Sequence, residues 1–65
     1  MVRMTTIVIL PSADEIPVHR REYRVDRAGD EVIAIEKFLI RYHRVPETVF
    51  VWRGMMYIPT VEGEK

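Results

Sequence analysis

The chain has 65 residues, with ten basic and ten acidic side chains and no cysteine, so its formal net charge is zero. This length predicts one domain, residues 1–65, whose small core has no disulfide to support it. The zero net charge argues against a protein that holds nucleic acid through bulk charge alone.

Composition also bears on metals, membranes and source. Only His19 and His43 carry imidazoles, too few for a structural zinc site without thiolates, so we expect no metal and no cofactor. No apolar run approaches the about 20 residues of a membrane span. None has the length of a signal-peptide core either, so we expect a cytoplasmic protein without a membrane partner. Abundant charged residues with no Asn, Gln or Cys are typical of a thermophile.

The first third of the chain predicts two strands. Residues 5–10, TTIVIL, form a β-branched apolar run that predicts a strand buried on both faces, at the centre of a sheet. Pro11 ends it, and residues 11–17 have the composition of a turn. Residues 18–25, VHRREYRV, predict a second strand whose dense charge suits a sheet edge. Alternatively, these charges form a basic contact surface.

A helix is predicted over residues 30–43. Asp26 or Asp30 is a suitable N-terminal cap, and Pro46 stops the helix. Its apolar residues share one wide stripe, which we expect to pack on the sheet. The members of that stripe are Val32, Ile35, Phe38, Leu39 and Tyr42.

Residues 48–58, TVFVWRGMMYI, predict a β-hairpin around Arg53-Gly54. A two-residue loop pairs Trp52 with Met55, and the alternation of side chains then separates two apolar faces. One face is aliphatic and holds Val49, Val51, Met56 and Ile58. The other, which we call the aromatic face, holds Phe50, Trp52, Met55 and Tyr57. We expect the helix to cover the aliphatic face, and the reverse arrangement is the alternative.

Together these elements predict the α+β class: a small ββαββ chain with a β-grasp-like sheet and one helix packed on one face. The aromatic face then stays uncovered, unless the loop 11–17 or the tail 59–65 folds over it. Ile33 and Ile40 fall on a flank of the helix outside its core stripe. Uncovered apolar surfaces of this kind predict a contact with another molecule.

The segment PETVFVWRG, residues 46–54, and the preceding order of strand, strand and helix resemble ubiquitin-like β-grasp proteins of the ThiS/MoaD sulfur-carrier type. In that family a last strand inserts at the sheet centre beside the first strand, and a C-terminal Gly-Gly carries the sulfur. This chain reads TVEGEK there, with Gly63 but no glycine pair, so the resemblance gives it no carrier activity. Either the hairpin pairs directly with the first strand, or a second chain supplies the pairing. Both arrangements favour dimerisation by strand addition or exchange.

We find no catalytic signature and expect no enzyme. Ser12 is the only serine and has no base near it, and the three glycines are isolated, so they form no phosphate loop. We therefore expect a non-catalytic interaction module, a homodimer or an adaptor for a protein partner. Its expected partner-binding residues are Phe50, Trp52, Arg53, Met55, Tyr57, Ile33 and Ile40.

Two alternatives remain open. The aromatic face is a suitable platform for single-stranded nucleic acid, whose bases would stack on the rings. The phosphates would then be met by Arg20, Arg24, Arg44 and Arg53. In the other alternative, the chain is a partial relative of the sulfur carriers that docks on their enzymes without carrying sulfur.

Overall fold

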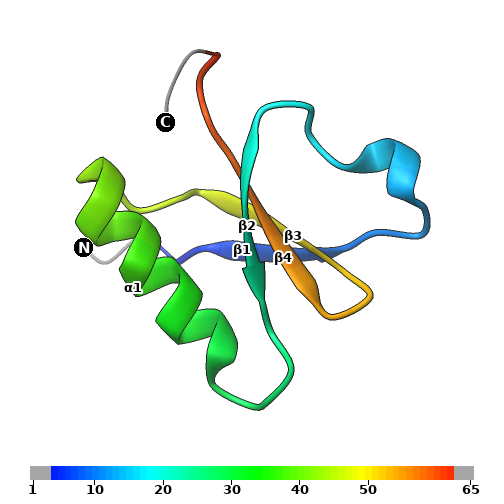
Figure 1. Cartoon of the computed structure of the whole chain (residues 1–65), viewed down its shortest axis with the longest axis horizontal. Helices are drawn as coiled ribbons and strands as arrows, with labels where there is room; N and C mark the ends of the chain where they lie inside the picture. The colour runs from blue at the N-terminus through cyan, green and yellow to red at the C-terminus, as the bar shows by residue number, and fades with distance from the viewer. Residues whose placement is uncertain (1–3, 63–65) are drawn as a thin grey trace.

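The computed structural model describes residues 4–62. Its elements are β1 (Thr6–Ile9), the 3-10 helix η1 (Ala13–Glu15), β2 (Arg20–Arg24), α1 (Asp30–Tyr42), β3 (Thr48–Trp52) and β4 (Met55–Pro59). The strands form one four-stranded mixed sheet, and α1 lies against one of its faces (Figure 1). This confirms the predicted α+β class and the ββαββ order.

The strands are arranged in the order β1-β3-β4-β2. β1 runs parallel to β3, whereas the other neighbours are antiparallel. The prediction of a central first strand is therefore wrong, because β1 lies at an edge. Its apolar side chains point to the two faces of the sheet, so they indicate cover above and below the strand and not the number of strands beside it. The prediction of an edge position for the charged second strand is confirmed, since β2 forms the opposite edge.

The hairpin has the predicted register, with Trp52 opposite Met55 and Phe50 opposite Tyr57. Both loop residues have positive φ, 49° at Arg53 and 78° at Gly54. A two-residue loop of this conformation matches the twist of the two strands that it joins. Glycine adopts it without steric cost, whereas Arg53 adopts a conformation that L side chains disfavour.

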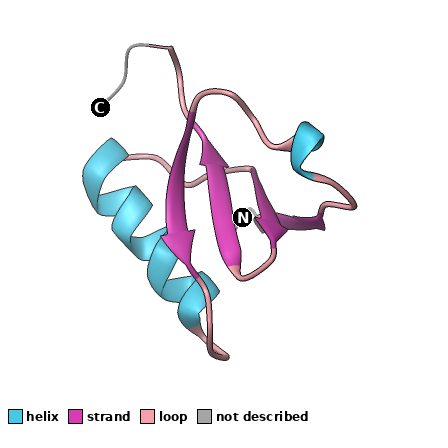
Figure 2. Ribbon diagram, turned by 45° about the vertical axis from the view of Figure 1, so that its right-hand side comes forward, coloured by secondary structure: helices cyan, strands magenta, loops and turns pink. Residues whose placement is uncertain are grey.

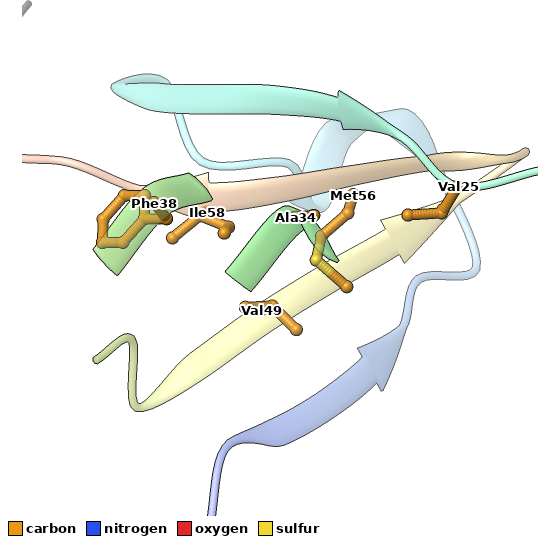
Figure 3. Close-up of a cluster of buried hydrophobic side chains, with 6 residues drawn as sticks. All are labelled: Val25, Ala34, Phe38, Val49, Met56 and Ile58. Carbon is orange, nitrogen blue, oxygen red and sulfur yellow. The ribbon is translucent and has the colours of Figure 1, made fainter. Parts of the chain in front are cut away.

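The core lies between α1 and the aliphatic face of the hairpin (Figure 3). Val49, Met56 and Ile58 are fully buried there beneath Phe38 and Ala34 of the helix. The prediction that the aliphatic face meets the helix is thus confirmed. None of the six side chains drawn in Figure 3 comes from β1, which runs beside β3 beyond Val49.

The helix has nearly the predicted bounds but a different N-terminal cap. Its cap is Gly29, in a left-handed conformation, and the structure assigns no side-chain cap there. Asp30 instead accepts hydrogen bonds at Oδ2 from the backbone N–H groups of Asp26, at 2.9 Å, and Arg27, at 3.0 Å. The carboxylate thereby fixes the loop between β2 and α1.

The predicted core stripe of the helix is partly wrong. Phe38 is buried, and Ile35 and Tyr42 pack partly against the core, but Val32 and Leu39 are exposed. The reason is the position of α1 over the sheet, since it makes its main strand contact with β2. The flank that carries Val32 and Leu39, on the side of α1 away from β2, therefore lies outside the core.

The chain itself partly covers the aromatic face. The connection between β1 and β2, which includes η1, lies on the side of the strands opposite α1 (Figures 1 and 2). On this side Leu10 and Tyr57 are each only 7% exposed, and Ile16 and Pro17 of the connection are half-buried. The expectation of a wholly uncovered aromatic face is therefore wrong, and the position of the connection agrees with the alternative in which loop 11–17 folds over it. Of the tail 59–65, residues 63–65 lie outside the described residues.

Candidate functional site

The aromatic face is less accessible than the sequence predicts. Phe50, Trp52 and Met55 are partly buried, and Tyr57 is buried. The Arg53 guanidinium lies over the Trp52 ring, 4.8 Å from its centroid. Arg20 lies over Tyr57 at 5.4 Å. Two of the three rings are therefore already stacked against the chain's own cations.

The structure does not bring the whole predicted partner-binding set together. Ile33 and Ile40 lie on α1, on the other side of the sheet from the aromatic face (Figure 1). Both are exposed, but neither is continuous with Trp52 or Tyr57. Binding of a partner by the aromatic face stays a prediction, and that face does not include the two isoleucines.

Three of the four predicted nucleic-acid arginines share the aromatic face. Arg20 and Arg24 belong to it because β2 alternates and Arg24 pairs with Met55, and Arg53 joins them at the hairpin tip. Arg20 forms an ion pair with Glu22 at 2.7 Å. Arg44 lies elsewhere, over the ring of Phe38 at 4.9 Å on the helix side.

A different apolar surface, which the sequence analysis missed, lies along β1. We call it the β1 surface. Its exposed fractions are 50% for Ile7, 72% for Ile9, 60% for Val32 and 40% for Leu39. Ile7 and Ile9 belong to the helix-covered face of the sheet, because they pair in register with Val49 and Val51. The run TTIVIL was a usable signal, since its apolar side chains at successive positions need cover on both faces.

Val32 and Leu39 lie on the flank of α1 that faces β1. Lys37 and Leu39 are the sequence neighbours of the buried Phe38, so they point about 100° to either side of it. Lys37 lines a hollow together with Tyr23 of β2, which fixes its flank as the β2 side. Leu39, and Val32 two turns before it, therefore lie toward β3 and β1.

At the open edge of the sheet, the backbone of β1 has polar groups that point away from β3. The N–H of Thr6 donates to Glu47 O at 2.9 Å, and the N–H of Leu10 donates to Val51 O at 3.1 Å. Backbone N–H and C=O groups point to alternate sides along a strand, so those of Val8 also face β3. The N–H and C=O groups of Ile7 and Ile9 consequently face outward, where no strand of residues 4–62 pairs with them.

The two edges of the sheet differ in charge. β2 presents four charged side chains, Arg20, Arg21, Glu22 and Arg24, which discourage pairing with another strand. β1 reads TIVI and has none. β1 is short, but an uncharged edge with apolar side chains and unpaired backbone groups is the kind of edge that accepts a further strand.

The described residues offer little for other chemistry. Among them, no group of three or more His, Asp or Glu side chains is placed to hold a metal ion. No helix within residues 4–62 is long and apolar enough to cross a bilayer. One open hollow lies at Arg44 and Glu47, and another lies at Asp30 and Lys37. Neither lining contains a serine, cysteine or histidine that would serve as a nucleophile or general base.

Comparisons with protein-family models, curated proteins and solved structures find no match for this chain. The resemblance to the sulfur carriers therefore stays a prediction. In that family a last strand inserts at the sheet centre beside the first strand, whereas within residues 4–62 β1 has only β3 as a neighbour and lies at the edge of the sheet. The hairpin pairs directly with the first strand, which is one of the two arrangements expected from the sequence.

Proposed function

We propose that this protein is a small, non-catalytic interaction module that binds an extended protein segment along β1. The observation that carries the proposal is the outward-facing backbone of Ile7 and Ile9 at an uncharged edge. Strand addition uses such groups, because main-chain hydrogen bonds supply affinity and alternate side chains supply specificity.

The side chains around this edge favour an apolar ligand. Ile7 and Ile9 project on the face that α1 only partly covers, and Leu39 lies on the flank of α1 that faces them. Fully burying one such side chain contributes roughly 1.5–3 kcal/mol. The proposed ligand is therefore a strand with apolar residues at alternate positions. The proposed binding surface is therefore the β1 surface, and not the aromatic face that the sequence predicts.

A peptide-library selection tests this function. Peptides selected on the wild-type protein should show alternating apolar residues, and Ile9→Lys should weaken their binding about tenfold, because it places a charge in an apolar contact. Ile40→Lys is the matched control: Ile40 is 76% exposed, like Ile9 at 72%, but lies outside the β1 surface. Selected peptides that bind both variants equally well would show that the contact lies elsewhere.

Binding of single-stranded nucleic acid is the second candidate, and the presence of Arg20, Arg24 and Arg53 on the aromatic face supports it. The zero net charge and the ion pair of Arg20 with Glu22 count against it. Titration with short oligonucleotides at low salt should quench Trp52 fluorescence if bases stack there. Arg24→Glu is the control, and it should weaken any quenching that depends on this face. An unchanged Trp52 signal in the wild-type protein removes this candidate.

A further inference from the structure

We propose that the strand bound at β1 is β1 of a second copy of this chain, paired antiparallel about a two-fold axis at Val8. This inference rests on the proposed function and names its partner. A two-fold contact uses the same patch on both molecules, so the patch must complement itself. β1 meets this condition in its hydrogen-bonding groups, its charge and its side chains.

The outward backbone groups fit such a pairing. With Val8 opposite Val8, Ile7 of one copy stands opposite Ile9 of the other, and the converse pair follows by symmetry. Ile7 and Ile9 are the residues whose N–H and C=O groups face off the sheet. Each pair therefore exchanges two hydrogen bonds, as in an ordinary antiparallel ladder. Pro11 has no N–H, so it limits the ladder at its end.

Charge distinguishes β1 from the other edge. Residues 4–13 contain no charged side chain, so two antiparallel copies of β1 meet without repulsion. The same operation on β2, centred at Glu22, would set Glu22 against Glu22 and Arg20 against Arg24. Like charges directly opposite one another destabilise a strand pair. Self-pairing is therefore favoured at β1 and opposed at β2.

The side chains complete the fit. In this arrangement both α1 helices lie on the same face of one continuous eight-stranded sheet. Ile7 and Ile9 of the two copies then form a single apolar strip, flanked by Leu39 and Val32 of each helix. A contact between strands of four residues falls below the standard interface size, so we expect a micromolar dimer that dissociates on dilution.

Sedimentation velocity over a concentration series tests the proposal. Wild type should pass from monomer to dimer, and Ile9→Lys should raise the dissociation constant about tenfold by placing an ammonium against Ile7 of the other copy. Ile40→Lys should leave it unchanged. The double variant I7E/I9K should recover dimerisation, because the proposed register sets each glutamate opposite a lysine.

Each outcome bears on the proposal. A wild type that stays monomeric throughout, a dimer that is insensitive to Ile9→Lys, or a double variant no better than Ile9→Lys overturns it. A monomeric wild type that still binds selected peptides through Ile9 overturns self-pairing but leaves the proposed function standing. Loss of peptide binding as well would remove both.

A crosslinking variant provides a second readout if the charged variants fail to fold. The chain has no cysteine, so Val8→Cys carries a single thiol. At the two-fold axis the two Cα atoms would lie about 4.5 Å apart, as in a non-hydrogen-bonded antiparallel pair. That separation permits a disulfide. Mild oxidation should link Val8→Cys into dimers and leave Ile40→Cys unlinked, and equal yields for the two variants would contradict the proposed axis.

Discussion

Ile7 lies beside Val49 in the parallel register of β1 and β3, yet Val49 is fully buried and Ile7 is half exposed. The two side chains project from the same face of the sheet on neighbouring strands. The difference arises because α1 lies toward β2, so its cover ends before β1. An amphipathic helix is about two strands wide, since strands lie about 4.8 Å apart and a helix is about 10 Å across. One helix therefore leaves part of a four-stranded sheet open.

This difference in cover predicts unequal costs for two identical substitutions. Ile58→Ala removes a fully buried side chain and should lower the free energy of unfolding by about 2–5 kcal/mol. Ile9→Ala truncates an exposed side chain and should change it by less than about 0.5 kcal/mol in the dilute monomer. Urea unfolding monitored by Trp52 fluorescence measures both. Equal losses would show that Ile9 is covered in the isolated chain.

The hairpin turn should depend on backbone conformation at Gly54. Gly54→Ala places an L residue at φ 78° and should destabilise the chain by roughly 1–2 kcal/mol. The cost is one of backbone strain and not of crowding, because a Cβ there would meet only Asp26 Oδ1, at an ordinary 3.7 Å. Chemical synthesis with D-alanine at position 54 is the control, since that residue favours positive φ. Thermal unfolding should find the D-alanine chain close to wild type and the L-alanine chain less stable.

The loop before α1 should depend on the Asp30 carboxylate. Asp30→Ala removes the acceptor of the two N–H groups at Asp26 and Arg27, and should cost about 1 kcal/mol because both N–H groups can turn to water instead. Asp30→Asn keeps an acceptor oxygen and should retain most of that stability. Chemical denaturation compares the two, and an alanine variant as stable as the asparagine variant would argue against these hydrogen bonds.

The hydroxyl of Tyr42 should be dispensable. This buried oxygen has no hydrogen-bond partner in the part of the chain that the structure describes, whereas the ring stacks on Phe38 with centroids 4.5 Å apart. Tyr42→Phe keeps the ring contact and removes an unsatisfied polar group, so it should stabilise the chain by about 1 kcal/mol. A clear loss of stability in urea titration would mean that the hydroxyl is bonded in solution.

The order of elements and the hairpin follow from local features of the sequence. The turn at Arg53-Gly54 fixes the register of residues 48–58, and strand alternation then separates Val49 from Phe50. The charges of 20–24 indicate an edge because they act on any approaching strand. These features need no knowledge of distant parts of the chain, which is why they are predictable.

Long-range placement was not predictable in the same way. The apolar run 5–10 suits a central strand and an edge strand equally well, because the choice depends on which strand finds β3. The lateral position of α1 is also a tertiary property, and it exposes Leu39 although the helical stripe includes it. The β1 surface depends on both placements. For the same reason the sequence directed attention to the aromatic face, which is partly buried in the folded chain.

Amide hydrogen exchange at β1, measured as a function of protein concentration, tests the central claim most directly. The N–H groups of Ile7 and Ile9 face off the edge, whereas that of Val8 faces β3. If β1 pairs with a second copy, exchange at Ile7 and Ile9 should slow as concentration rises, while Val8 changes little. Exchange at Ile7 and Ile9 that stays equally fast from dilute to concentrated solution would contradict the account.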